Sequence, residues 1–151
     1  MRRPRREILE MIYLDTSALL KLYLRGKGSE EVHEIVTSQD LPLPVWELQE
    51  MEFINALHLK VFWKKLSQKD CNAQLAHFDS RKARGLYFFP EIRRPQLQKD
   101  FRDLATRTPK IGCRTLDIMH LACALQLEIT RFVTFDDRQR KLAKLAGLPL
   151  T

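Results

Sequence analysis

The chain has 151 residues, of which 44% are hydrophobic and 30% are charged, and its formal net charge is +7. This size and composition indicate one globular domain with a real hydrophobic core. They exclude a membrane span, because no apolar run approaches the ~18 residues that a span requires, and no signal-peptide hydrophobic stretch follows the basic start. We therefore expect a cytoplasmic protein with no membrane partner.

The net charge and the cysteines indicate which partners and which stabilising groups the protein is expected to have. Residues 1–10 are expected to be a basic, flexible extension, and residues 11–151 a single domain that remains basic without it. A basic body favours a polyanionic partner through counterion release, and a solvated basic helix face is the alternative. Three cysteines without CxxC spacing argue against a disulfide framework or a zinc cluster. We expect reduced thiols, with Cys123 in the core.

Strands and helices are expected to alternate along the first half of the chain. Met11–Leu14 is typical of a strand buried on both faces. Pro42 and Pro44 allow only a short or edge strand at Leu41–Val45, and Ser67 resembles the cap of the helix that follows it. The expected elements are strands at 11–14 and 41–45, and helices at 18–24, 29–36, 46–66 and from 68 to near Gly85.

The second half continues the alternation. A helix that is apolar almost all round is predicted at Leu116–Leu127, with Thr115 as its cap, and such a helix is buried. The other expected elements are strands at 86–89, 132–135 and 148–150, and helices around 97–104 and at 138–146. Alternating strands and helices predict βαβ units, and hence an α/β fold with a parallel sheet covered by helices on both faces.

Four acidic residues lie inside or at the end of apolar segments, where a charge is costly unless it is paired or bound to a metal. They are Asp15, Glu52, Asp117 and Asp136. Asp15 and Asp136 end the two best strands, and a parallel sheet places both carboxyl ends at one edge. Asp117 stands in the first turn of the buried helix, and Glu52 one to two turns into the long helix. Each is able to face that edge.

Crowded carboxylates repel one another and shift toward protonation, so such a cluster is stable at neutral pH mainly with a cation inside. All-oxygen ligation suits Mg²⁺ or Mn²⁺. These ions lower the pKa of bound water and stabilise charge on an attacked phosphorus, as in metal nucleases. A basic body with an acidic metal pocket therefore fits cleavage of nucleic acid.

Structural roles are the alternative for each of these residues. Asp117 suits a helix dipole, and Asp136 or Asp137 suits a helix cap, a role that we assign to Asp137. His120, one turn after Asp117, is expected to be a packed histidine rather than a ligand. Thr16, Ser17 and Thr115 are expected to be caps first, with hydroxyls that can also orient carboxylates or metal-bound water.

The four acidic residues lie in four stretches of the chain, which in order are MIYLDTSALLKLYL, EMEFINAL, RTLDIMHLACAL and FVTFDDRQRKLAKLAGL. These stretches resemble the motifs of PIN-domain ribonucleases of the VapC toxin type. Each alone is weak evidence, but four in the right order and at the right distances are specific together. Carried over residue by residue, the family's acidic site falls on Asp15, Glu52, Asp117 and Asp136, as catalytic residues and metal ligands.

The resemblance implies a three-layer α/β/α PIN domain with a central, mainly parallel sheet of four to five strands. It also implies Mg²⁺ or Mn²⁺ dependence and endonucleolytic hydrolysis of RNA by a metal-activated water. The implied partners are the RNA substrate, a cognate VapB-type antitoxin and a second copy of the chain in a homodimer. Substrate contacts are assigned to Thr16, Arg114, Thr115 and Arg138.

The segment 85–110 carries no motif of this family. Its aromatic and arginine residues suit stacking on single-stranded RNA, and a core or dimer interface is the favoured alternative. A further alternative for the whole chain is a PIN-like module that binds RNA or protein without cutting. Other acidic-site enzymes fit less well: a haloacid dehalogenase phosphatase needs an aspartate where Ser17 stands, a receiver domain expects a lysine near Asp136, and a P-loop is absent.

Overall fold

The computed structural model describes residues 10–39 and 41–150, which form a mixed α/β fold. The expected basic extension at residues 1–10 lies almost entirely outside this range. In chain order the elements are β1 (Ile12–Leu14), α1 (Thr16–Leu20), α2 (Ser29–Thr37), β2 (Leu43–Pro44), α3 (Glu47–Phe62), α4 (Gln68–Ala83), β3 (Tyr87–Phe88), α5 (Arg94–Ala105), α6 (Thr108–Ile111), α7 (Thr115–Gln126), β4 (Arg131–Val133) and α8 (Asp137–Leu145).

The strands are parallel, as predicted. β1 pairs with β4, with Leu14 opposite Val133, and β2 pairs with β3. β2 also lies beside β1, and Leu150 forms a parallel bridge to Phe132 of β4. Among the described residues the extended segments therefore lie in the order β3, β2, β1, β4 and Leu150. The N–H groups of Leu43 and Val45 donate to Leu86 and Phe88. Pro44, between them, has no N–H to offer on the opposite side of β2, and in the described part of the chain the two strand pairs β1–β4 and β2–β3 are not hydrogen-bonded to each other.

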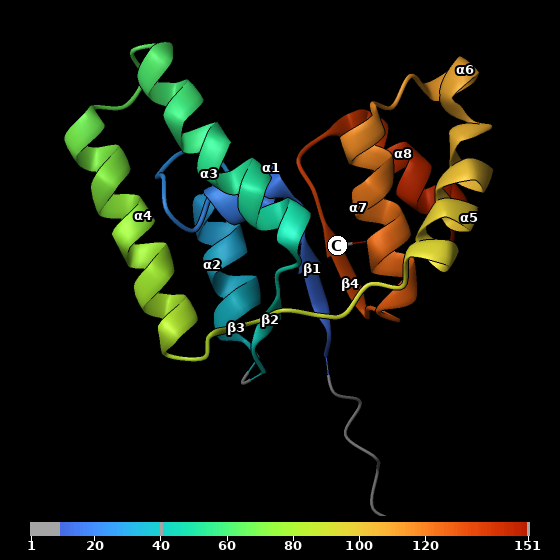
Figure 1. Cartoon of the computed structure of the whole chain (residues 1–151), viewed down its shortest axis with the longest axis horizontal. Coiled ribbons are helices and arrows are strands. Elements are labelled where there is room, and N and C mark those ends of the chain that lie inside the picture. The colour runs from blue at the N-terminus through green and yellow to red at the C-terminus, as the bar shows by residue number, and fades with distance from the viewer. Residues whose placement is uncertain (1–9, 40, 151) are drawn as a thin grey trace, which may run out of the picture.

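Helices cover both faces of these strands, which confirms the predicted layered α/β fold. Figure 1 shows α1–α4 on one side of β1 and β4, and α5–α8 on the other. Successive side chains of β1 point to opposite faces. Ile12 and Leu14 belong to the core packed with α1–α4, whereas Tyr13 belongs to the core packed with α5, α7 and α8.

Two helices differ from the sequence expectation. α1 ends at Leu20, and a turn rather than a helix follows it. The long helix expected at 46–66 ends earlier, as α3 at Glu47–Phe62, and it buries Gln49, Phe53 and Leu57, while Phe62 is 79% exposed. Gln49 belongs to the buried face because its amide donates to the carbonyl of Leu14 at 2.6 Å, a role that apolar spacing does not register.

The structure also shows where the cysteines and the aromatic residues of segment 85–110 lie. The described thiols Cys71, Cys113 and Cys123 are free and buried, which confirms Cys123 as a core residue. In the segment 85–110, Tyr87 is a core residue and Phe89 is exposed. Within the described ranges, no helix is long and apolar enough to cross a membrane.

β1 and β4 end side by side, so the residues that follow them lie close together. Leu14 and Val133 are partners at the ends of the two strands, and the N–H of Asp15 donates to the carbonyl of Val133 at 3.1 Å. The residues that follow each strand, Asp15 and Thr134 onward, therefore leave the sheet at the same edge. In open α/β sheets this edge is where ligands bind.

Candidate active site

Asp15 is buried at the end of β1 and serves as the N-cap of α1. Its Oδ1 accepts hydrogen bonds from the N–H of Ala18 at 2.8 Å and the hydroxyl of Ser17 at 2.6 Å. Its Oδ2 is 2.7 Å from the hydroxyl of Thr134. Oδ1 has used both of its lone pairs, whereas Oδ2 keeps one. The open lone pair of Asp15 is thus on the oxygen nearer to the segment after β4.

Gln139 links that oxygen to two other acidic positions. Its side chain is fully buried, its Oε1 is 2.7 Å from the Thr134 hydroxyl, and its Nε2 donates to the carbonyl of Asp117 at 3.1 Å. Its N–H donates to Oδ1 of Asp136 at 2.7 Å. Thr134 has one hydroxyl proton for two acceptors. When the hydroxyl donates to Asp15, Gln139 Oε1 therefore lies 2.7 Å from the Thr134 oxygen without a proton between them.

Asp117 and Asp136 line one open hollow together with Arg114 and Arg138. The hollow has a volume of about 420 Å³ and also includes Asp137. Asp117 stands in the first turn of α7, and its Oδ2 accepts from the N–H of Arg114 at 3.3 Å. The two arginines bring positive charge beside the carboxylates, which suits a phosphate-bearing ligand.

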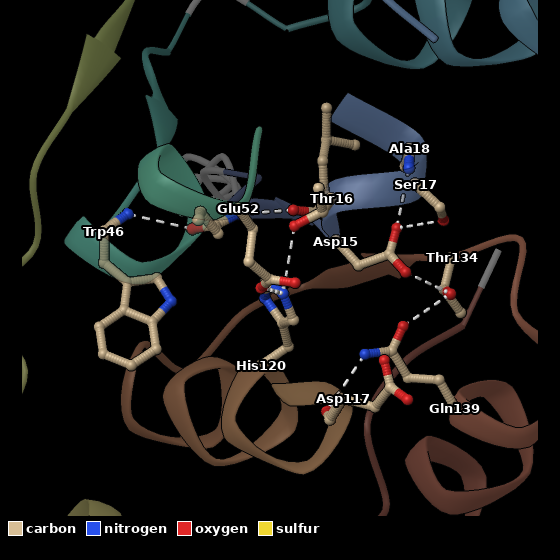
Figure 2. A network of polar contacts seen from close by, with 12 residues as sticks. Asp15, Thr16, Ser17, Ala18, Trp46, Glu52, Asp117, His120, Thr134 and Gln139 are labelled. Atoms are coloured by element: carbon tan, nitrogen blue, oxygen red, sulfur yellow. Dashed lines mark hydrogen bonds and ion pairs between the residues drawn. The ribbon is translucent and has the colours of Figure 1, made fainter. Parts of the chain in front are cut away.

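Glu52 reaches the site from α3 and is held by His120 of α7. Its Oε1 is 2.5 Å from His120 Nε2, and the hydroxyl of Thr16 is 3.3 Å from the same nitrogen. Figure 2 shows Asp15, Glu52 and Asp117 in one polar network, each on a different element. The prediction that His120 is packed is confirmed, because it is 2% exposed.

A buried relay fixes the orientation of His120. Trp46 Nε1 donates to the hydroxyl of Tyr13 at 3.1 Å, and that hydroxyl is 2.8 Å from His120 Nδ1. Burial holds the pKa of Tyr13 well above its ordinary value, so the phenol keeps its proton. With a neutral imidazole, Tyr13 then donates to Nδ1 and the Nε2–H donates to Glu52. The relay leaves no ring nitrogen of His120 free for a metal.

The four carboxylates share one feature: each is anchored through hydrogen bonds and retains acceptor capacity. Among the oxygens of these four carboxylates, three accept no hydrogen bond from the described residues: Glu52 Oε2, Asp117 Oδ1 and Asp136 Oδ2. Oδ2 of Asp15 accepts one and keeps a free lone pair. Such oxygens are hard donors of the kind that Mg²⁺ and Mn²⁺ prefer.

Electrostatics oppose the metal-free arrangement. Burial raises the pKa of Asp15, and its hydrogen bonds only partly offset that effect. Burial also raises the pKa of Asp117, with further contributions from the charges of Asp136 and Glu52. Loss of hydration is thus the main cause in both cases, and crowding of like charge adds to it at Asp117. A cation beside these groups would remove both costs.

The described residues contain no group of three or more histidine, cysteine or acidic side chains already arranged to hold a metal ion. Glu52 is engaged by His120, and Asp136 caps α8 through the N–H of Gln139. The structure therefore brings the four carboxylates to one edge of the sheet without closing them into a single coordination sphere.

Several predicted caps are wrong. Asp136, not Asp137, is the N-cap of α8. Thr16 and Thr115 are the first residues inside α1 and α7, whose N-caps are Asp15 and Arg114. The backbone of Arg114 takes this place because the Asp117 carboxylate reaches back to its N–H. Ser17 does orient a carboxylate, as expected for its hydroxyl.

The four residues predicted to contact substrate do not all lie at the same place. Arg114 and Arg138 line the hollow with two of the carboxylates, and Thr16 contacts His120. Thr115 is exposed at the start of α7 and does not line that hollow.

Sequence reasoning missed Thr134 and Gln139, which join three of the acidic positions. One signal was available: Gln139 stands three residues after Asp136, at the spacing of a capping interaction, among residues of an otherwise charged helix. The burial of a glutamine at this position depends on the fold and was not visible in the pattern.

Comparison with known proteins agrees with this geometry. A family profile described as "PIN domain" matches residues 12–145. The chain is 31% identical over 139 residues to Ribonuclease VapC46 of Mycobacterium tuberculosis, covering 91% of this chain and 93% of that protein.

Solved structures resemble the fold at low sequence identity. The crystal structure of Mycobacterium tuberculosis VapC20, described as a Sarcin-Ricin loop cleaving toxin, has a TM-score of 0.66 at 13% identity, covering 91% of this chain and 95% of that one. FitAcB from Neisseria gonorrhoeae has a TM-score of 0.61 at 16% identity, with coverages of 93% and 96%. VapBC-1 from nontypeable Haemophilus influenzae has a TM-score of 0.57 at 18% identity, with coverages of 93% and 97%. The chain, with its acidic residues gathered at the carboxyl ends of parallel strands, belongs to the PIN domain family.

Proposed function

We propose that the protein is a metal-dependent endoribonuclease and the toxin of a VapBC-type toxin–antitoxin pair. The observation that carries the proposal is the set of four anchored carboxylates, Asp15, Glu52, Asp117 and Asp136, at one edge of the sheet. The similarity to Ribonuclease VapC46 over most of both chains supports ribonuclease activity. The arginines beside Asp117 and Asp136 support a phosphate-bearing substrate.

The residues fit Mg²⁺ or Mn²⁺. Their open donors are carboxylate oxygens, and the raised pKa values of Asp15 and Asp117 reflect charge that lacks compensation. When bound, such an ion lowers the pKa of a water ligand and stabilises charge on the attacked phosphoryl group. Asp15, Glu52, Asp117 and Asp136 would hold it. Catalysis then requires no covalent intermediate on a side chain.

The protein's own groups have distinct tasks in this scheme. Asp15 is fixed by three hydrogen bonds, so its Oδ2 is presented in one direction. His120 donates to Glu52 and orients that carboxylate. Arg114 and Arg138 would hold substrate phosphates beside the hollow, and Thr16 would support the His120 contact. Because these groups stand on rigid elements, little reorganisation is needed when RNA binds.

The proposed partners are RNA, a VapB-type antitoxin and a second copy of this chain in a homodimer, with action in the cytoplasm. Resemblance to the solved FitAcB and VapBC-1 structures supports a toxin fold of this type. An antitoxin that inhibits such a site would have to cover the carboxylate edge and compensate its charge.

Incubation of the purified protein with total RNA tests the activity. We expect fragments with Mg²⁺ or Mn²⁺ and none with EDTA. Asp15→Asn and Asp117→Asn should abolish cutting while the fold survives, because an amide at position 15 can donate to the Thr134 hydroxyl and free its proton for Gln139. Asp79→Asn is the matched control, since Asp79 is exposed on α4 and does not line the hollow of Asp117 and Asp136. Metal-independent fragments, or normal cutting by both active-site variants, would reject the proposal.

A further inference from the structure

The turn between α3 and α4 carries an exposed aromatic and basic tip. Phe62 is 79% exposed and Trp63 is 54% exposed. Four lysines surround them in the sequence, at positions 60, 64, 65 and 69, against one acid, Asp70. Figure 1 shows this turn at the end of a helical arm that projects away from the strands. We define residues 59–70 as the α3–α4 tip.

The tip has a fixed backbone. The N–H of Lys64 donates to the carbonyl of Val61 at 3.0 Å, and the N–H of Lys65 donates to the carbonyl of Lys60 at 2.9 Å. These two bonds form a Schellman motif, in which the left-handed position is usually glycine. Here Lys64 occupies it with φ 56°, a conformation that costs a lysine free energy. The turn therefore displays a charged side chain where a glycine would fold more easily.

A basic hollow adjoins the aromatic pair. It has a volume of about 350 Å³ and is lined by Arg25, Lys60 and Lys65, with Asp70 as its acidic member. Lys65 also lies over the Trp63 ring, with its Nζ 5.8 Å from the ring centroid. Cations that line a shallow hollow beside an exposed indole match the two parts of a nucleotide, its phosphate and its base.

The tip and the candidate active site share one face of α3. Trp63 follows Glu52 by eleven residues, which is about three helical turns and a rise of about 16 Å. Leu59 lies between them on the same face and is 38% exposed. An RNA strand that lies along α3 would thus contact the aromatic tip at one end and the carboxylates at the other.

We propose that the α3–α4 tip is a binding subsite for single-stranded RNA, in which Trp63 stacks on a base and Lys60 and Lys65 contact phosphates. The inference rests on the proposed function and deepens it by locating part of the substrate. RNA is favoured over a protein partner because lysine is depleted from protein–protein interface cores, whereas lysines interleaved with aromatic rings suit single-stranded nucleic acid.

Fluorescence anisotropy with a labelled, mixed-sequence, single-stranded RNA of about 16 nucleotides tests the subsite. The full chain carries Asp117→Asn in every sample, and EDTA is present, so that the RNA is not cut. We expect Trp63→Ala to raise the Kd by about tenfold or more. Lys60→Gln combined with Lys65→Gln should make the slope of log K against log salt shallower by about 1.4, for two lost phosphate contacts.

Phe89→Ala is the matched control. Phe89 is 43% exposed and has a lysine amine, that of Lys82, 4.6 Å from its ring centroid. It is therefore a similar aromatic–lysine pair away from the tip, and its substitution should leave the Kd unchanged. A Kd unchanged in Trp63→Ala, or raised equally in Phe89→Ala, would overturn the proposal.

Measurement of the oligomeric mass distinguishes an RNA subsite from a protein–protein interface at the tip. If Trp63→Ala lowers the mass measured by light scattering and leaves RNA affinity unchanged, the tip is a protein–protein interface and the proposal fails. The proposed function is tested separately, because its readout is cleavage by the protein without the Asp117→Asn change. Tip-dependent RNA binding without cleavage would reject the nuclease and keep the subsite, whereas cleavage with tip-independent binding would do the reverse.

Discussion

Tyr13→Phe isolates the relay that orients His120. The substitution removes one hydroxyl and keeps the ring, which stacks on Phe132 with centroids 5.5 Å apart. Trp46 Nε1–H and His120 Nδ1 then lose their hydrogen-bond partner in a buried environment. Leaving a buried polar group unsatisfied costs about 1–3 kcal/mol. Because two groups lose their partner, we expect a loss of about 2–6 kcal/mol in the free energy of unfolding.

The substitution should also change how His120 faces Glu52. Without the Tyr13 hydroxyl, Nδ1 of His120 loses its partner, and the imidazole proton stays on Nε2, where it bonds the Glu52 carboxylate. The ring is then oriented by its contacts at Nε2 alone. We expect weaker binding of Mn²⁺ as a consequence, because Glu52 is no longer held in one orientation.

Urea denaturation measures the stability term, and an unchanged slope would show that only stability has altered. Nitrogen-15 NMR of the imidazole, recorded without metal, measures the hydrogen bond at Nδ1, whose resonance should shift when Tyr13 no longer donates to it. Trp46→Phe is the matched control, since it removes the indole donor but keeps the bond between Tyr13 and His120, and the Nδ1 resonance should change little. An unfolding free energy and an Nδ1 resonance that both remain unchanged in Tyr13→Phe would refute the relay.

Three further predictions concern stability. The raised pKa values of Asp15 and Asp117 mean that the metal-free folded state binds more protons than the unfolded chain, so their contribution to stability should rise as pH falls from 7 to about 3.9. Urea midpoints of the wild-type protein and of Asp117→Asn at several pH values test this. A contribution of Asp117 that falls with pH would contradict it. Gln139→Leu keeps the volume but leaves the carbonyl of Asp117 without its amide donor, so we expect a loss of about 1–3 kcal/mol, whereas a neutral effect would show that the bridge is dispensable. At Gly28, φ is 88° and an added Cβ would lie 2.6 Å from Phe135 Cε1. Gly28→Ala should therefore lower the free energy of unfolding by about 1–3 kcal/mol in the same denaturation assay. Gly26→Ala is the control, because an added Cβ there has nothing within 4 Å.

The sequence predicted the elements that have strong local signals. The strands predicted at 11–14 and 132–135 and the apolar helix predicted at 116–127 appear as β1, β4 and α7 with slightly different bounds, because their burial leaves little choice of phase. The four acids were recognised by the same reasoning, since a charge at the end of an apolar run needs a partner.

The features that sequence could not predict depend on contacts between distant residues. The buried face of α3 includes Gln49 because its amide donates to the carbonyl of Leu14, and a count of apolar residues cannot detect such a contact. The cap of α8 is Asp136, whose carboxylate accepts the N–H of Gln139, and the side chain of Gln139 is in turn held by the distant carbonyl of Asp117. The relay through Tyr13 and Trp46 joins positions 33 residues apart, and no local pattern records it.

The proposed activity depends on the four carboxylates acting together on one divalent cation. Calorimetric titration of Mn²⁺ into the metal-free protein tests this most directly, with Asp15→Asn, Glu52→Gln, Asp117→Asn and Asp136→Asn in parallel and the exposed Asp79→Asn of α4 as the control. We predict that each of the four active-site variants weakens Mn²⁺ binding and that the control does not. Mn²⁺ binding that is undetectable in the wild-type protein, or unchanged in all four variants, would contradict the central claim.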